Sequence, residues 1–195
     1  MRRRKQPVEL PLGGEPRFPD PNAFDAEGLV AFSGDLSPQT LLAAYGAGIF
    51  PWYSEETVPL WWSPDPRALL TPDRLHVSRS LLRTMRRGSF VLTWNRSFQA
   101  VMVACGEERE EGTWVIPEMV DAYLELHRLG HAHSLEVWAD GQLVGGTYGV
   151  QRGALFAAES MFHRRTDMSK VALVALDRKS TRLNSSHANI SYAVF

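Results

Sequence analysis

One stretch decides the fold class of this 195-residue chain: Ser134-Leu-Glu-Val-Trp-Ala-Asp-Gly-Gln-Leu-Val-Gly-Gly-Thr-Tyr-Gly-Val150. Two runs rich in β-branched and aromatic residues, 134–139 and 142–150, flank the dipeptide Asp140-Gly141, which is typical of a tight hairpin turn. A third strand is predicted at 154–158. Helices are predicted before and after these strands, so the expected fold class is α+β.

Capping residues and helix-ending glycines outline the helices around the hairpin. Helices are predicted after Ser37, after Ser78 (residues 79–87) and after Asn95, because Ser and Asn side chains satisfy the free N–H groups of a helix start. Two later helices begin at Pro117 and after Asp167. A strand is predicted at 90–94, and a charged segment near 106–113 is the predicted domain boundary.

Composition limits the possible classes of protein. The formal net charge is −1, so the chain as a whole has no general attraction to nucleic acid or to an anionic membrane. Cys105 is the single cysteine, which excludes an internal disulfide and predicts a small core residue. The apolar runs are too short for a membrane span, and no apolar segment follows the basic N-terminus as in a secretory signal. A cytoplasmic protein is expected.

Residues 48–67 contain four prolines and three of the six tryptophans, namely Trp52, Trp61 and Trp62. Prolines exclude a helix interior, so this stretch is predicted to be a stiff loop crowded with indole rings. Such rings either pack in the core or stack on a planar ligand, and this stretch alone leaves both readings open.

A basic helix follows this tryptophan loop. Arg79, Arg83, Arg86 and Arg87 fall within about 100° of one helix face, opposite an apolar stripe. Guanidinium groups match phosphate oxygens, and a basic groove beside aromatic rings is a general way to hold single-stranded nucleic acid. A solvated surface helix is the alternative.

Other reactive residue types have simpler readings. His127, His131 and His133 are predicted to be structural rather than zinc ligands, because Gly130 ends the helix between them. Ser160 lacks the small neighbours of a nucleophile elbow. The segment 144–146, Val-Gly-Gly, indicates a β-bulge or a close backbone approach.

Taken together, the motifs resemble one family, the leucyl/phenylalanyl-tRNA–protein transferases, from about residue 18 to residue 176. The motifs that carry the resemblance, in chain order, are Gly34-Asp-Leu-Ser-Pro38, Gly48-Ile-Phe-Pro-Trp52, Trp61-Trp-Ser-Pro-Asp-Pro-Arg67, His76-Val-Ser-Arg-Ser80, Glu111-Gly-Thr-Trp114, His127-Arg-Leu-Gly-His-Ala-His-Ser134, Val144-Gly-Gly146 and Glu159-Ser-Met-Phe162.

The resemblance implies an activity and a fold. The family transfers leucine or phenylalanine from aminoacyl-tRNA to the N-terminal Arg or Lys of a protein, which marks that protein for degradation by the bacterial N-degron pathway. It implies a small N-terminal domain followed by a domain resembling the GNAT acyltransferases. It also implies no metal or cofactor, no membrane partner and a monomer.

The resemblance further implies roles for residues at matching positions. Glu159 lies at the reacting centre and orients the aminoacyl group or the acceptor amine. The other expected contacts are Trp52 and Trp114 to the terminal adenosine, an apolar side-chain pocket of Tyr123, Phe156 and Leu173, and acceptor-stem phosphates bound by Arg79, Arg83, Arg86 and Arg87. Thr147 is more polar than expected beside such a pocket.

After Leu176 the resemblance stops. The predicted organisation is a disordered tail (1–17), an N-terminal domain (18–110), a partial GNAT-like domain (111–176) and a non-native tail (177–195). A sheet without its last strands exposes an edge, so this chain is expected to fold poorly and to transfer little. Two alternatives remain: a non-catalytic tRNA- or RNA-binding module, and a GNAT-type acetyltransferase, although no glycine-rich pyrophosphate loop is evident at 161–170.

Overall fold

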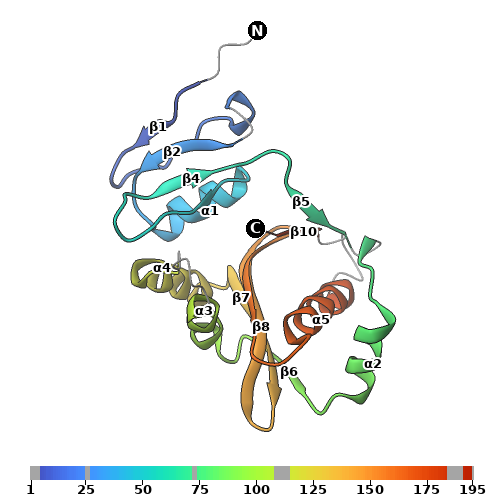
Figure 1. Cartoon of the computed structure of the whole chain (residues 1–195). Coiled ribbons are helices and arrows are strands. Elements are labelled where there is room, and N and C mark those ends of the chain that lie inside the picture. The colour runs from blue at the N-terminus through green and yellow to red at the C-terminus, as the bar shows by residue number, and fades with distance from the viewer. Residues whose placement is uncertain (1–4, 25–26, 72–73, 108–114, 184–190, 195) are drawn as a thin grey trace.

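The computed structural model describes residues 5–24, 27–71, 74–107, 115–183 and 191–194. Helices and mixed sheets alternate along the chain, which confirms the α+β class. The strands form one sheet in the order β1-β2-β4-β3 and a second in the order β5-β10-β9-β8-β7-β6. Figure 1 shows the first sheet with helix α1 above the second sheet, which has α3 and α4 on one side and α5 on the other.

The first sheet is built from the N-terminal third of the chain. Its strands and helix are β1 (Val8–Leu10), β2 (Leu29–Ser33), β3 (Phe50–Pro51), β4 (Leu60–Trp62) and α1 (Pro38–Gly46), with a 3₁₀ turn at Pro21–Ala23. Strand β1 pairs in parallel with β2. The prediction of a disordered tail over residues 1–17 is therefore wrong for 8–10. The backbone N–H and C=O groups of these residues find hydrogen-bond partners on β2, and the local sequence does not reveal this pairing.

The second sheet collects strands from both halves of the chain. They are β5 (Ala68–Leu70), β6 (Val91–Trp94), β7 (Ala132–Ala139), β8 (Gln142–Arg152), β9 (Leu155–His163) and β10 (Ser191–Val194). Strands β5 and β6 precede the boundary predicted near 106–113, and the chain passes from the first sheet to the second between β4 and β5. The domain boundary itself stays a prediction.

Strand β10 lies beside β9, the last of the antiparallel strands β6 to β9. It runs parallel to β9 and antiparallel to β5, so the edge of β9 that was expected to be exposed is paired. The prediction that residues 177–195 are non-native stays a prediction.

The central hairpin has the predicted turn. Asp140 and Gly141 have φ angles of 51° and 75°, as a type I′ turn requires, and Trp138 pairs with Leu143 across it. Strand β9 is longer than the predicted 154–158, because its pairing with β8 extends to His163.

The remaining helices mostly begin where their caps predict. They are α2 (Arg79–Arg87), α3 (Phe98–Glu107), α4 (Pro117–Arg128) and α5 (Met168–Leu183). Ser37 and Ser78 accept hydrogen bonds from Thr40 N and Leu81 N, at 3.3 and 3.2 Å. Asn95 is not the cap of α3: its Oδ1 instead accepts from Ser134 N on β7 at 2.9 Å.

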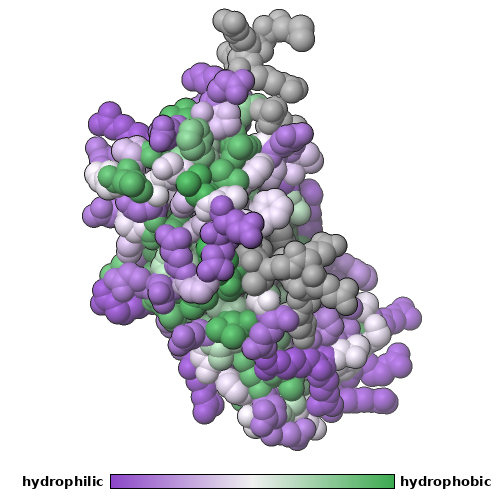
Figure 2. All heavy atoms as spheres, turned by 60° about the vertical axis from the view of Figure 1, so that its left-hand side comes forward, coloured by the Kyte–Doolittle hydropathy of each residue, from purple (hydrophilic) through white to green (hydrophobic). Residues whose placement is uncertain are grey.

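Two apolar clusters form the core. The first is continuous from the first sheet and α1 to α3, α4 and one face of the second sheet. The second lies between the opposite face of that sheet and α5, with Leu81 of α2. Figure 2 shows apolar patches between hydrophilic side chains on one face of the molecule. No helix within the described ranges is both long and apolar enough to cross a bilayer.

Candidate active site

Two β-bulges interrupt the central strands. Val137 pairs with Gly145 and Trp138 with Leu143, so Val144 is an extra residue in β8, where the sequence predicts a bulge. In β9, Ala158 pairs with Gly149 and Ser160 with Tyr148, which leaves Glu159 as the extra residue. A bulge re-aims side chains, and this second one turns a carboxyl toward the junction between the sheets.

Glu159 is a buried carboxyl in a partly polar setting. Its residue is 3% exposed, and its Oε1 accepts no hydrogen bond from the residues that the structure describes. Burial raises the pKa of this carboxyl to about 8, while the Tyr45 hydroxyl and the Arg67 guanidinium act in the opposite direction. Glu159 is therefore an acid whose proton exchanges near neutral pH, which is a common property of catalytic carboxyls.

Two tyrosines stand beside Glu159. The hydroxyls of Tyr45 on α1 and Tyr123 on α4 are hydrogen-bonded to each other, and the two rings meet edge to face with centroids 6.5 Å apart. Burial, followed by the charge of Glu159, raises the pKa of both phenols well above the ordinary value. Both tyrosines thus remain neutral hydrogen-bonding groups at physiological pH.

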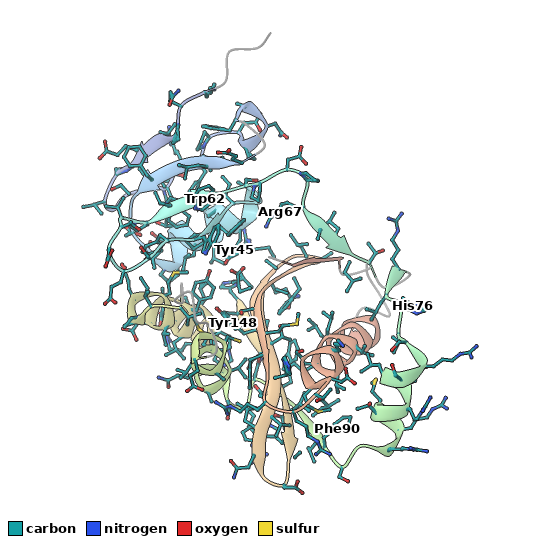
Figure 3. The ribbon with its side chains drawn as sticks, in the orientation of Figure 1. Tyr45, Trp62, Arg67, His76, Phe90 and Tyr148 are labelled. Carbon is teal, nitrogen blue, oxygen red and sulfur yellow. The ribbon has the colours of Figure 1, made fainter. Side chains whose placement is uncertain are left out.

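Arg67 approaches the carboxyl from the segment after β4. Its Nη1 donates to the carbonyl oxygen of Gly48 at 2.5 Å, and its guanidinium lies 5.0 Å from the centre of the Phe50 ring. These two contacts fix the cation at the junction of the two sheets. Figure 3 shows Tyr45, Arg67 and Tyr148 at this junction, contributed by α1, the segment after β4 and β8.

The tryptophans of the 48–67 loop divide into two groups. Trp61 is fully buried and donates to the carbonyl oxygen of Ser33 at 2.8 Å. Trp62 donates to the carbonyl oxygen of Trp52 at 2.8 Å and meets its ring edge to face. Trp52 itself is 54% exposed. Trp61 and Trp62 brace the loop, whereas the indole of Trp52 is open to solvent.

The basic helix α2 has the predicted orientation. Leu81 is buried and Leu82 and Met85 are half-buried, which anchors one face. The exposed residues on the other face are Arg79, Arg83, Arg86 and Arg87. Among the residues described, none of these four forms an ion pair, so α2 presents a concentrated positive charge to solvent.

The predicted apolar pocket is not gathered in one place. Tyr123 belongs to the cluster on the α3–α4 face of the second sheet, whereas Phe156 belongs to the cluster on the α5 face. Leu173 lies on α5 and is half-buried. Side chains alternate across a strand, so Phe156 of β9 points away from Tyr123. Trp114 lies outside the described residues.

Several residues have structural roles, as the sequence indicates. His127 stacks on Phe98 with ring centres 4.4 Å apart, and His133 stacks on Trp94 at 5.4 Å. Cys105 is buried in the core. Thr147 is fully buried, and its hydroxyl donates to the carbonyl oxygen of Ser160 at 3.0 Å. This bond gives the buried hydroxyl a partner at a position where an apolar residue was expected.

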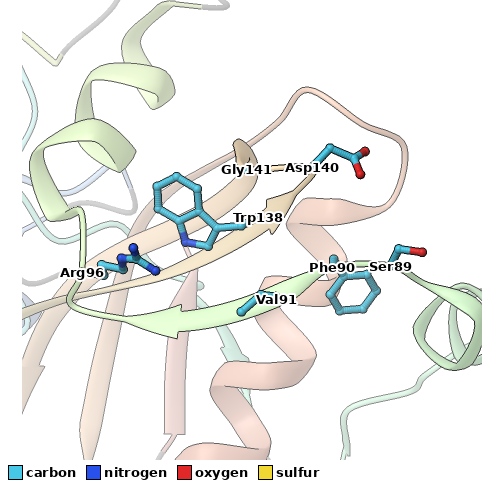
Figure 4. A pocket seen from close by; sticks show the side chains of 7 residues that line it. All are labelled: Ser89, Phe90, Val91, Arg96, Trp138, Asp140 and Gly141. Atoms are coloured by element: carbon cyan, nitrogen blue, oxygen red, sulfur yellow. The ribbon is translucent and has the colours of Figure 1, made fainter.

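A cavity of about 280 Å³ lies elsewhere, at the outer edge of the second sheet. Figure 4 shows Trp138 and Arg96 on one side of it and Phe90 and Val91 on the other, with the hairpin turn at one end. The Arg96 guanidinium lies 5.7 Å from the Trp138 ring centre. None of the predicted site residues lines this cavity.

Sequence reasoning missed Tyr45 and Arg67 as site residues. Tyr45 looks like an ordinary core position of an amphipathic helix. Arg67 closes the Trp61–Arg67 motif, and this position in a family motif was the signal that could have found it.

Solved structures give distant likenesses of the fold. An aminoglycoside acetyltransferase from an uncultured soil metagenomic sample matches with a TM-score of 0.41 and 11% identity, covering 56% of this chain and 78% of that one. L-PGS from Bacillus licheniformis matches with a TM-score of 0.46 and 10% identity, covering 84% of this chain and 50% of that one. At these scores the likenesses carry no argument about function.

Curated relatives are far more similar. A leucyl/phenylalanyl-tRNA–protein transferase from Anaeromyxobacter sp. (strain Fw109-5) is 57% identical over 166 residues, which are 84% of this chain and 71% of that protein. The transferase of the same name from Aromatoleum aromaticum is 53% identical over 88% of this chain and 74% of its own length.

Family profiles match both parts of the chain. The profile described as leucyl/phenylalanyl-tRNA protein transferase matches residues 69–190, and the profile of that enzyme's N-terminal domain matches residues 34–65. The gap between the two matches coincides with the passage from the first sheet to the second. The chain belongs to the leucyl/phenylalanyl-tRNA protein transferase family.

Proposed function

We propose that the chain transfers leucine or phenylalanine from an aminoacyl-tRNA to the N-terminal Arg or Lys of a protein, as a monomer in the cytoplasm, and that it does so more slowly than its longer relatives, as expected from the loss of resemblance after Leu176. Its acceptors are thereby marked for degradation by the N-degron pathway. Family membership supports the reaction class. The buried Glu159, whose Oε1 has no hydrogen-bond partner among the described residues, is the observation in this chain that carries the chemical part of the proposal.

The reaction needs positioning and proton transfer rather than a covalent nucleophile. The acceptor α-amine attacks the ester carbonyl carbon, a C–N bond forms, and the C–O bond to the terminal ribose breaks. The amine loses a proton and the ribose oxygen gains one, so no other reactant is consumed. Placing the amine against an activated ester supplies most of the rate enhancement.

Glu159 suits the proton transfer. Its pKa of about 8 is close to the value of about 7.7–8.0 that is usual for an α-amine. A proton therefore passes between the two groups at little energetic cost, and the amine becomes the unprotonated nucleophile. We assign Glu159 the role of orienting this amine and accepting its proton.

The tRNA is bound by two separate surfaces. We assign the terminal adenosine to the exposed indole of Trp52, together with Trp114. We assign the phosphates to Arg79, Arg83, Arg86 and Arg87, which are exposed on α2. Of the predicted apolar pocket we retain Tyr123, because it borders Glu159, whereas Phe156 and Leu173 lie on the α5 side of the sheet.

The test is transfer of radiolabelled leucine from Leu-tRNA to a peptide with N-terminal Arg, with the Anaeromyxobacter relative as positive control. Glu159→Gln should reduce transfer at least about 100-fold, in line with the loss of a proton-accepting group. Its affinity for Leu-tRNA should change less than about threefold, which is below 1 kcal/mol. Glu125→Gln is a matched carboxyl-to-amide control on α4. Transfer by Glu159→Gln at the parent rate would exclude the assigned role.

The same assay separates the alternatives. Binding of Leu-tRNA by the parent chain without any transfer selects the RNA-binding module. Turnover of acetyl-CoA with the same peptide selects the acetyltransferase.

A further inference from the structure

We propose that Tyr45 and Arg67 are positioning residues for Glu159, and that they hold its carboxyl so that Oε1 stays free for the acceptor amine. Both come from the N-terminal third of the chain, whereas Glu159 lies on the second sheet. This inference rests on the proposed function, because it takes Glu159 to be the group that meets the amine.

Tyr45 can orient the carboxyl because its hydroxyl lies between the Tyr123 hydroxyl and Glu159 in a chain of hydrogen bonds. A phenol carries one hydroxyl proton and can also accept a hydrogen bond. When Tyr45 donates to the ionised Glu159, its oxygen accepts from Tyr123, which is hydrogen-bonded to it. One carboxylate oxygen is then occupied by Tyr45, and Oε1 has no partner among the described residues.

Arg67 supplies the compensating charge. The hydrogen bond to Gly48 O and the cation–π contact with Phe50 hold its guanidinium in place, and its charge acts on the Glu159 carboxyl. In a buried setting, an opposite charge stabilises the ionised acid far more than it does in water. Burial and the charge of Glu159 act on Arg67 in turn: burial lowers the pKa of Arg67 and the carboxylate raises it.

The other groups around Glu159 are phenols. Tyr123 comes from α4, and Tyr148 of β8 pairs with Ser160 next to the bulge and meets the Tyr123 ring at 6.1 Å. Tyr53 lies one step further away, and its hydroxyl donates to Glu118 Oε2 at 2.9 Å. Among these neighbours Arg67 is the cation, so the ionised state of Glu159 depends on Arg67 and on the donated hydrogen bond of Tyr45.

The test measures the titration of the Glu159 carboxyl carbon by ¹³C NMR in the 195-residue chain labelled on glutamate. Glu159→Gln identifies the signal by its loss. In Tyr45→Phe and in Arg67→Gln the titration midpoint should move up by about 1 pH unit or more. Tyr53→Phe is the matched control, since it removes a buried phenol that bonds to Glu118 instead, and its midpoint should stay.

Transfer kinetics provide the second measurement. The acidic limb of the pH profile of kcat should move upward in Tyr45→Phe and Arg67→Gln and remain in place in Tyr53→Phe. A merely structural role would lower the rate without moving this limb. If Tyr45→Phe loses its cooperative thermal transition, Arg67→Gln carries the test alone.

An unchanged titration midpoint in a folded Arg67→Gln chain would overturn the proposal. A shifted midpoint combined with full transfer by Glu159→Gln would refute the proposed function and leave the coupling between these side chains intact. The two failures are therefore distinguishable.

Discussion

At the scale of single residues, Glu159 is costly to the fold. Its carboxyl is buried at a bulge, one of its oxygens has no hydrogen-bond partner in the part of the chain that the structure describes, and burial outweighs the stabilisation that Tyr45 and Arg67 provide. Local arrangements of this kind persist because a site needs a group poised to exchange a proton. Stability and chemistry therefore make opposite demands at this position.

The free-energy cost of burying the Glu159 carboxyl should depend on pH. The pKa of Glu159 is raised from 4.5 to about 8, so between these values the unfolded chain releases a proton that the folded chain keeps. The burial cost is absent below about pH 4.5, grows with pH, and is complete above about pH 8. We expect Glu159→Gln to gain stability relative to the parent chain over this range, by a few kcal/mol at about 1.4 kcal/mol per pKa unit. Urea unfolding at a series of pH values measures the gain.

The exposed Glu9→Gln serves as the control for the carboxyl-to-amide change. A difference between Glu159→Gln and the parent chain that is constant from pH 4 to pH 9 would contradict the assignment.

At the scale of elements, α2 separates its two functions by face. Leu81 anchors the helix against the second core cluster, and four exposed arginines occupy the opposite face. Their charge has no partner among the described residues, so an anionic ligand gains most of its affinity from releasing counterions.

The affinity for Leu-tRNA should therefore fall steeply with salt. Replacing all four arginines by Gln should reduce the slope of log affinity against log salt by about 0.9 for each lost phosphate contact. Filter binding at several salt concentrations measures this slope. Arg128→Gln is the matched control, because Arg128 already pairs with Glu125 at 2.6 Å. Equal slopes for the quadruple variant and the parent would remove α2 from the tRNA surface.

Elements with local signals were predictable from the sequence. The Asp140-Gly141 turn, the Ser78 cap and the amphipathic pattern of α2 each act within a few residues, and the structure confirms them. Long-range pairing was not predictable: β1 has no strong pattern of its own, and β5 and β6 join the second sheet across a large sequence separation. The site follows the same rule, since Glu159 was found by motif but its neighbours Tyr45 and Arg67 depend on how the two sheets meet.

At the scale of the whole molecule, the two sheets share one core. We call the first sheet with α1 the first unit, and the second sheet with its helices the second unit. The first cluster includes Leu41 and Trp61 from the first unit and Phe98, Met119 and Tyr148 from the second. Helix α1 packs against both α4 and β8. Neither unit buries this surface alone, so each depends on the other for stability.

The chain should consequently unfold in a single transition. With 5-fluorotryptophan incorporated, the ¹⁹F signals of Trp61 in the first unit and Trp138 in the second should lose their folded intensity at the same urea concentration. Single Trp→Phe variants assign the two signals. Midpoints separated by more than about 0.5 M urea, at an m-value of about 2 kcal/mol/M, would show that the units unfold independently.

The Tyr45–Tyr123 contact has a consequence for the evolution of this family. The buried hydroxyl pair ties the residue at position 123 to the residue at position 45, because the Tyr123 hydroxyl would lose its hydrogen-bond partner if Tyr45 were replaced by an apolar residue. Related sequences should therefore change both positions together or neither. Chimaeras can join the first sheet of one divergent relative to the second sheet of another. They should be more active when the residues at positions 45 and 123 come from the same parent than when they come from different parents.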